Sequence, residues 1–505
     1  MNNSFFPKPA LLVGICIYNL FALPIWAQSN ELAETVVEAR LWEERSDRVP
    51  ASTQRIEDLS NNATADIYLL QRLSANIGLE ASSVQTRATI RGITGLDAGL
   101  QDPVGYYVNG VGLPLGGNQT PPLSMFESLE LIKGPQGALY GRNTETGAIK
   151  LNSPTPDWFP SAEISINSFS VEGGDGESGG HILKFSGSNE LIENRLAGRI
   201  SFRGHDETGP MINQLDQSDQ GGNINGGSFS AGLLWQSEQD TEVEFNILVD
   251  EQDPGRNRFR FDSGMAATDR FVTNADVEGF DDDSTRIYSN EIRHQFNRFE
   301  LTAITGITDY ERQFEIDLDA TPAPLPATRL DLENTSVSQE IRISSATPDS
   351  EFNWLGGVYF YHESSDIEFE ISPMFMTTDR NTEIEQNGRA VFGQLEYQFA
   401  SNWRASFGGR YERIKQSGDQ VRWRKPFGRW RSSRRCWSSS PSRAPSADRK
   451  YRRRHRRCRR WRRRRNPPQP WRLVSLRRSL CSHRQLSLLR YPHGAQEYHR
   501  RHQPS

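Results

Sequence analysis

The most regular pattern along the chain is an alternation of apolar and polar side chains in short segments after residue 155. In one of the clearest segments, the first face of an extended strand would hold Trp403, Ala405, Phe407, Gly409 and Tyr411. Its second face would hold Arg404, Ser406, Gly408 and Arg410. A period of two with one apolar and one polar face predicts β-strands that separate two different environments.

Eleven segments share this texture, and each is predicted to be a strand. They are 162–169, 181–187, 196–203, 228–236, 242–250, 286–296, 299–310, 336–345, 352–361, 389–399 and 403–413. Long acidic connections such as 206–227 and 265–285 alternate with short ones such as 297–298 and 401–402. This asymmetry is typical of transmembrane β-barrels, whose loops are long on one side only. A soluble β-sandwich alternates too, so the period alone leaves that alternative open.

The region 61–155 has a mixed pattern and predicts a compact α+β domain. Residues 66–73 could form a short helix, and residues 104–111 read as a strand with a turn at Asn109 and Gly110. A further short strand is expected at 129–133. Residues 28–60 are polar and carry no strong periodicity, so we expect a flexible arm there.

The first 27 residues have the features of a secretory signal peptide. Lys8 supplies a positive flank, residues 10–23 carry no charge, and Ala27 offers a small-residue cleavage site. The apolar run is shorter than the roughly 20 residues of a membrane-spanning helix. Residues 28–420 contain no cysteine, which excludes disulfides and thiolate metal sites there.

Charge divides the chain near residue 420. Residues 421–505 hold 26 Arg and 2 Lys against two acidic residues, whereas residues 1–420 hold 31 basic and 62 acidic ones. Dense Arg with interleaved Trp could bind nucleic acid. A tail of that kind has no evident substrate on an exported protein, so we interpret 421–505 as a disordered, out-of-frame segment.

Four motifs in the N-terminal half resemble those of the TonB-dependent receptors of Gram-negative bacteria. They are Glu34, Thr35, Val36, Val37, Glu38 and Ala39, then Thr89 to Gly92, Asp102 to Val111, and Glu127 to Asn152. The first resembles a TonB box, an extended segment that could add as a strand to the sheet of a partner. The others resemble the plug domain, and the last is the most specific because it is long and ordered.

The resemblance implies mainly structural roles for the plug residues. They are Arg91, Gly92, Asn109, Gly110, Lys133, Gly134, Pro135, Gly137, Tyr140, Gly141, Arg142 and Gly147. In the family, plug arginines pair with glutamates of the barrel wall. Glu340 is the predicted partner of Arg91 or Arg142, since a partly desolvated arginine needs a carboxylate. Ligand contacts are expected around 95–100 and 113–119.

The resulting expectation is an α+β plug domain followed by an incomplete transmembrane antiparallel β-barrel with about half its strands. The domains would be a signal peptide (1–27), an arm with the TonB box (28–60), the plug (61–155), the partial barrel (156–420) and the tail (421–505). Such plugged barrels have about 22 strands, which need well over 400 residues. Residues 157–420 are too few, so the chain itself is predicted to be a non-functional fragment.

The implied function is TonB-dependent uptake of a scarce ligand, most often a ferric siderophore, across the outer membrane. The implied partners are the TonB complex, that ligand and outer-membrane lipid, with no nucleic acid and no cofactor. Scattered histidines and the acidic run 281–283 show no ligand spacing for a metal, and no catalytic motif is present, so the chain is not expected to be an enzyme. The alternatives are a nucleic-acid-binding protein and a secreted β-rich enzyme.

Overall fold

The computed structural model describes a set of segments that belong to one compact unit beginning at Val36. They are residues 36–37, 41–42, 44–45, 49, 51–62, 67–81, 86–95, 102–170, 178–215, 218–253, 260–345, 350–371, 376–400 and 403–426. The predicted signal peptide and most of the predicted tail lie outside these residues.

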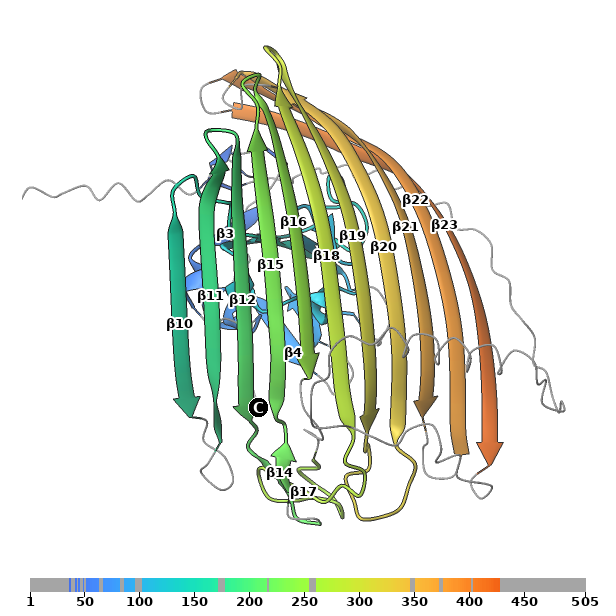
Figure 1. Cartoon of the computed structure of the whole chain (residues 1–505). Coiled ribbons are helices and arrows are strands. Elements are labelled where there is room, and N and C mark those ends of the chain that lie inside the picture. Colours follow the sequence, from blue (N-terminus) through green and yellow to red (C-terminus); the bar gives the residue numbers. More distant parts are fainter. Residues whose placement is uncertain are drawn as a thin grey trace, which may run out of the picture. The chain divides into compact units, whose positions relative to one another are not determined.

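Eleven strands form one curved sheet, which we call the wall (Figure 1). In spatial order they are β10 (Ser161–Ser170), β11 (Gly179–Ile192), β12 (Leu196–Thr208), β15 (Ile224–Gln236), β16 (Thr241–Asp253), β18 (Phe280–Gln295), β19 (Phe299–Ile316), β20 (Thr328–Ser345), β21 (Phe352–Ile371), β22 (Met376–Ala400) and β23 (Trp403–Pro426). All neighbours in this order are antiparallel. The order follows the chain, as in an up-and-down barrel.

The prediction of eleven strands is confirmed, because each predicted segment coincides with one strand of the wall. The strands are longer than predicted, and they gain most of their extra length at the end that carries the long connections. β22 has 25 residues and β23 has 24. As a result, the connection 372–375 between β21 and β22 is short although it lies at the long-connection end.

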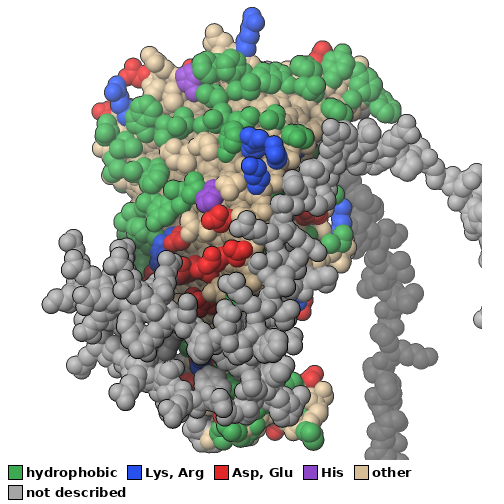
Figure 2. All heavy atoms as spheres, turned by 90° about the vertical axis from the view of Figure 1, so that its right-hand side faces the viewer, with side chains coloured by type: hydrophobic (Ala, Val, Ile, Leu, Met, Phe, Trp, Pro, Cys, Tyr) green, Lys and Arg blue, Asp and Glu red, His purple; other side chains and the backbone are tan. Residues whose placement is uncertain are grey.

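The outward face of the wall changes character along each strand. In β21, Phe352 and Phe360 are half exposed near the short-connection end, and the outward positions farther along are Ser364, Asp366 and Glu368. Figure 2 shows hydrophobic side chains gathered over one part of this face and acidic ones beside them. The apolar part is the surface expected to meet lipid.

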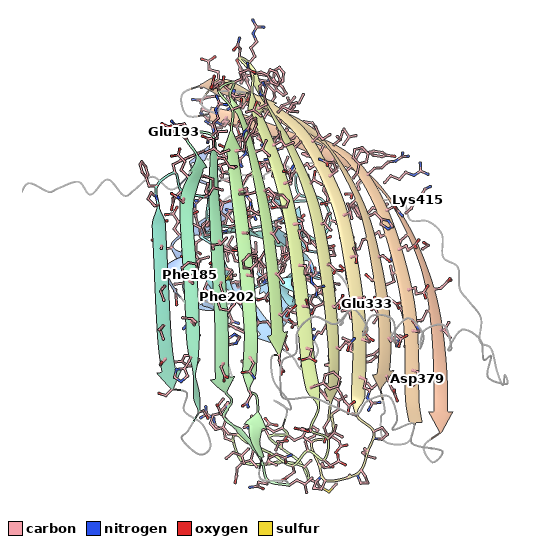
Figure 3. All side chains as sticks on the ribbon, viewed as in Figure 1. Phe185, Glu193, Phe202, Glu333, Asp379 and Lys415 are labelled. Carbon is pink, nitrogen blue, oxygen red and sulfur yellow. The ribbon has the colours of Figure 1, made fainter. Side chains whose placement is uncertain are left out.

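Beyond the apolar part, acidic residues face one another directly across neighbouring strands. One such row consists of Glu311, Glu333, Asp366, Glu383 and Asp419. Like charges in opposed positions destabilise a sheet, and they would be far more costly in lipid. This part of the wall therefore belongs in water. Figure 3 shows Glu333 and Asp379 in this part and Phe185 beside its cross-strand partner Phe202 in the apolar part.

The plug domain contains a five-stranded sheet on the concave side of the wall (Figure 1). In spatial order its strands are β3 (Ser52–Ile56), β8 (Ser128–Lys133), β9 (Gly147–Asn152), β6 (Val104–Val108) and β7 (Val111–Gly112). A hairpin of β4 (Ile77–Ala81) and β5 (Thr86–Ile90) lies apart from this sheet. The predicted strands and turn at 104–111 and 129–133 are confirmed.

The helices of the plug domain are short. They are η2 (Leu59–Asn61), α1 (Leu69–Leu73), η3 (Gly116–Gln119) and η4 (Leu123–Met125). The predicted helix at 66–73 is present from Leu69, and Asp66 lies outside the described residues. Two small sheets complete the description: β1 (Val36–Val37) with β2 (Glu44–Arg45), and β13 (Met211–Asn213) with β14 (Ser218–Gly221) and β17 (Val272–Thr273).

The central strands of the plug sheet, β8 and β9, are buried on both faces and carry apolar side chains on both. Leu129 and Leu131 join the main core, whereas Ile132 joins a smaller cluster on the opposite face. The one buried acid of β8, Glu130, contacts Lys150 at 3.3 Å and Arg55 at 3.0 Å. Buried charges of this kind need such partners.

None of the helices in the described part of the chain has the length and apolarity needed to cross a membrane.

A charge placed in the apolar part of the outward face should prevent stable insertion. We expect Phe360→Arg to cost about 2–4 kcal/mol, the range for arginine on the lipid face of a barrel. The measurement is urea-dependent unfolding of the chain in lipid vesicles. Ser364→Arg on the same strand and face is the matched control and should change little, because that position lies in the acidic part. Equal effects of the two substitutions would contradict the assignment of the lipid boundary.

Candidate functional site at the interface between plug and wall

The strongest contact between plug and wall centres on Arg142. Its Nη2 atom lies 2.5 Å from Oε2 of Glu363 in β21, and its guanidinium carbon lies 4.2 Å from the ring centre of Tyr361. Its Nη1 atom donates to Gln386 in β22. Burial is the largest single effect on the pKa of Arg142 and lowers it, but the charge and hydrogen bond of Glu363 together with the nearby Tyr361 and Tyr359 outweigh burial, so the pKa lies above its ordinary value. The arginine thus stays charged inside the interface.

The carboxylate of Glu363 belongs to a hydrogen-bond chain that returns to the plug. Asn334 in β20 donates from Nδ2 to Oε1 of Glu363 at 3.3 Å, and Gln119 of η3 donates from Nε2 to Asn334 at the same distance. Gln119 and Asn334 are each only 1% exposed. Two separate parts of the plug, Gln119 and Arg142, are therefore fixed to the same carboxylate region of the wall.

A second contact joins the plug loop around Gly141 to β23. Nη1 of Arg410 donates to the carbonyl of Leu139 at 3.4 Å, and Nε lies 2.9 Å from Glu412. A Cβ atom at Gly141 would lie 2.8 Å from the guanidinium carbon of Arg410. Gly141 also has φ of +83°, so both its backbone angle and its surroundings require glycine.

A third contact is made by the hairpin of β6 and β7. Its turn residues, Asn109 and Gly110, both have positive φ, as a tight two-residue turn requires. The next residue, Val111, packs so closely on β19 that a Cβ atom at Gly306 would come within 2.4 Å of it. The glycine in the wall therefore makes room for the edge of the plug sheet.

A cavity of about 310 Å³ lies between these contacts. Its lining includes Tyr107, Asn109, Glu244, Glu340, Arg342 and Arg410. Charges of both signs on opposing surfaces suit water and polar solutes rather than an apolar ligand. The plug is thus held by discrete polar contacts around a polar space.

Two predicted site residues lie elsewhere than expected. Glu340 does not pair with a plug arginine: its Oε1 lies 3.0 Å from Arg342, two residues along the same strand. Arg91 is exposed in the turn after β5 and forms no ion pair among the described residues, while its backbone N–H donates to Asn76 at 2.9 Å. The predicted plug–wall ion pair is corrected to Arg142 and Glu363.

The other motif residues hold the plug domain together. Lys133 donates to Ser74 Oγ at 3.1 Å, and the carbonyl of Tyr140 accepts from the Tyr107 hydroxyl at 3.1 Å. Positive φ is found at Gly92, Gly134 and Gly147. Pro135 and Gly137 lie in the loop that follows β8. These placements fit structural roles, which remain a prediction.

Only the centre of the predicted TonB box lies among the described residues, because Glu34, Thr35, Glu38 and Ala39 fall outside them. Val36 and Val37 form β1 and pair with β2. The side chain of Val37 is 1% exposed and packs with Ile132 and Ala148 of the plug sheet. The segment is therefore docked on the plug in this structure.

The expected ligand-contact regions are described in part. Residues 96–100 lie outside the described residues, and in 113–119 the side chain of Gln119 is turned to the wall. No group of three or more potential metal ligands occurs in the segments that the structure describes. Asp281 of the acidic run is bound by Arg312 at 2.8 Å.

Glu363, Asn334 and Gln386 of the wall are interface residues that the sequence did not single out, and Gln119 and Arg410 were not assigned to the interface. Arg410 was already on the polar face of its predicted strand, so the alternation of the two faces indicated that its side chain points into the lumen. Glu363 lies two residues beyond the predicted end of its strand, at 361. If the alternation of that strand had been continued by two residues, Glu363 would have been predicted on the lumen face.

Asp102 connects two parts of the plug by accepting hydrogen bonds from the backbone N–H groups of Val104 at 3.2 Å and Ala88 at 3.4 Å. Burial raises the pKa of this carboxyl from 3.8 to about 6, and the two backbone donors and Arg87 only partly offset that effect. The folded plug therefore favours the protonated form.

Comparison with known families gives two matches. The family model described as TonB-dependent receptor plug domain matches residues 47–148. The model described as TonB-dependent receptor-like β-barrel matches residues 207–442. Together the two matches cover the plug and most of the wall.

Among curated proteins, the chain is similar to the pesticin receptors of Yersinia. It is 27% identical to that of Yersinia enterocolitica serotype O:8 over 200 residues, which is 38% of this chain and 28% of that protein. For Yersinia pestis the identity is 29% over 195 residues, or 38% and 25% of the two chains. The chain thus spans under a third of the length of these relatives.

Solved structures share the fold. The ferric yersiniabactin uptake receptor of Yersinia pestis superposes with a TM-score of 0.64 at 18% identity, over 75% of this chain and 59% of that one. The ferripyoverdine receptor of Pseudomonas aeruginosa gives a TM-score of 0.60 at 12% identity, over 77% and 55%. At these identities the likeness establishes the architecture.

Breaking the buried ion pair should loosen the plug from the wall. Arg142→Met leaves Glu363 buried without its charge partner, and we expect a loss of about 2–5 kcal/mol, as for other truncated interfacial pairs. The measurement is urea-induced unfolding of the detergent-solubilised chain. Adding Glu363→Leu should recover part of the loss. Glu340→Gln is the control and should leave the free energy of unfolding nearly unchanged. A loss as large as that of Arg142→Met would instead assign the ion-pair partner of the plug to Glu340.

The raised pKa of Asp102 predicts a pH-dependent stability of the plug. Because the folded state favours the neutral acid, the contribution of Asp102 to the free energy of unfolding is greatest below pH 3.8. It is lost as the pH rises through about 6. In Asp102→Asn, the free energy of unfolding should change less with pH in that window. Above the window, the variant should be more stable than the wild type. Urea unfolding between pH 3.5 and 7.5 measures this, with the exposed Glu57→Gln as control for the charge change. An unchanged profile in Asp102→Asn would rule out this origin.

Proposed function

Because the chain belongs to the TonB-dependent receptors of the Gram-negative outer membrane, we propose that it serves the energised uptake of a ferric siderophore. The observation that carries the proposal is the buried ion pair between Arg142 and Glu363, together with the plug domain that it fixes to the wall. Two of the structural relatives are the ferric yersiniabactin uptake receptor of Yersinia pestis and the ferripyoverdine receptor of Pseudomonas aeruginosa.

In this proposal the wall spans the outer membrane with its short connections toward the periplasm. The apolar outward part lies in lipid, and the acidic part extends beyond it toward the outside. The ligand binds at the outer end of the plug and wall, and no covalent chemistry takes place. The plug closes the passage until the periplasmic partner acts on it.

The periplasmic partner would be TonB, which would bind residues 34–39. Val37 is packed on Ile132 and Ala148, and Val36 and Val37 pair with β2. Because the side chain of Val37 is 1% exposed and packed on the plug sheet, the segment is not accessible as a free strand for the sheet of a partner. Engagement therefore requires this segment to leave the plug, and a pull on it is transmitted to the plug sheet.

Uptake should depend on TonB and on the backbone of this segment. In cells without their own siderophore receptors, the proposal requires that the chain support uptake of radioactive iron supplied as ferric yersiniabactin or ferripyoverdine. The same measurement decides the prediction made from the sequence that the chain is a non-functional fragment. Val37→Pro removes a backbone donor and should lower uptake at least tenfold while ligand binding to the purified chain stays unchanged. The control is Val421→Pro, which also removes a backbone donor but lies near the end of β23, outside the plug sheet. This substitution should leave uptake unchanged.

The outcomes separate the parts of the proposal. Uptake that persists in cells lacking TonB would overturn energised transport, and no binding of either ferric siderophore would overturn the ligand class. Binding without uptake, in a chain that spans under a third of its curated relatives, would confine the proposal to ligand recognition.

A further inference from the structure

Three cations share the lumen face of two neighbouring strands of the wall, and both arginines among them act electrostatically on the lysine. They are Lys184 in β11 and Arg199 and Arg203 in β12. Lys184 and Arg203 are cross-strand partners, and Arg199 lies four residues before Arg203 on the same face. Their residues are 4%, 6% and 6% exposed, so all three charges are almost completely removed from water.

The three cations have unusually few partners. The ammonium of Lys184 donates to the backbone carbonyl of Ser60 in η2 of the plug. Nη1 of Arg199 donates to Ser230 Oγ at 3.3 Å, and Nη1 of Arg203 donates to Nδ1 of His205 at 3.1 Å. Nε and Nη2 of Arg199 and Nε of Arg203 are buried without a hydrogen-bond partner.

No ion pair involving these three side chains occurs in the part of the chain that the structure describes. The carboxylates that act on them do so from beyond ion-pair distance: Glu163 on Lys184, Asp250 on Arg203, and Glu127, Asp157 and Glu244 on Arg199. Asp250 already accepts hydrogen bonds from Ser228 at 2.6 Å and Gln252 at 2.7 Å. A buried guanidinium with free donors is costly unless a compensating anion is present.

The surrounding side chains are small hydroxyls. Ser186, Ser201 and Ser230 form a row of direct cross-strand partners between the level of Lys184 and Arg203 and that of Arg199. Serine hydroxyls can donate to anionic oxygens, as guanidinium and ammonium groups do. The site therefore combines unpaired cationic donors with neutral donors.

We propose that Lys184, Arg199 and Arg203 bind a small oxyanion, a phosphate or a carboxylate, where the wall meets η2 of the plug. The anion would accept from the free guanidinium nitrogens and balance the buried positive charge, for which planar arginine groups are well suited. It could be free inorganic phosphate or the carboxylate of a solute that passes the plug. The site does not depend on the proposed uptake function.

The test is equilibrium dialysis of the full chain in detergent at constant ionic strength. One arm uses radioactive inorganic phosphate and the other uses radioactive citrate. We expect saturable binding of one anion per chain, weakened at least tenfold by Arg199→Gln and by Arg203→Gln. Arg293→Gln is the matched control, because that lumen-facing arginine already has Glu291 at 2.7 Å, and it should bind as the wild type does.

Binding of both anions in competition would show that the site recognises the shared oxyanion chemistry. Phosphate alone would identify the free ion as the ligand, and citrate alone would identify a carboxylate. Near-ultraviolet circular dichroism establishes that each variant is folded, and Lys184→Gln replaces any variant that is not. The proposal is overturned if neither anion binds saturably to the wild type, or if the folded variants bind as tightly as Arg293→Gln. Either result would leave the uptake proposal untouched, because uptake is measured separately.

Discussion

The plug takes the lumen face of the wall out of water, so every charge on that face needs a partner across the interface or beside it. This requirement explains the main contacts. Arg142 meets Glu363, and Arg410 meets Glu412 and a backbone carbonyl of the plug. Each contact replaces water that the charged groups would otherwise bind. At Lys184, Arg199 and Arg203 the described residues do not meet this requirement, because guanidinium nitrogens of both arginines are buried without a hydrogen-bond partner. An anion there would make the region follow the same rule as the rest.

The sequence predicted the strands wherever the two faces of the wall meet different environments. In β22 the outward residues Val391, Leu395 and Tyr397 are exposed to the apolar side, and Gln394 and Glu396 between them are buried against the plug side. Lipid and lumen impose this alternation, so it is written in the sequence. Farther along, β22 has water on its outward face and begins at Met376, well before the predicted start at 389. There Glu383 and Glu385 occupy the outward face, and the inward positions beside them hold Thr382, Ile384 and Gln386. The alternation of apolar outward and polar inward residues therefore disappears while the backbone pairing continues.

The site was predicted less completely than the fold. The motif resemblance singled out Arg142, but its partner depends on how the plug is docked, and local sequence carries no information on that. Glu363 pairs across the sheet with Ser336, which lies four residues from Glu340 on β20. Four residues of a strand span about 13 Å, so the two glutamates face different levels of the plug. Strand parity could place both carboxylates on the lumen face, but only the register of the folded sheet could choose between them.

The polar nature of the interface also determines how the plug can be released. Separating an apolar interface exposes its buried surface to water, which costs about 25 cal/mol of free energy for each square ångström. A hydrogen bond that opens into a wet cavity is replaced by one to water, so its net contribution is only about 0.5–1.5 kcal/mol. The cavity between Glu340, Arg342 and Arg410 lets water reach the contacts one after another. A pull that begins at Val37 and passes through Ile132 to β8 would therefore meet a series of small barriers, so the same contacts fix the plug in one position and allow a local force to move it.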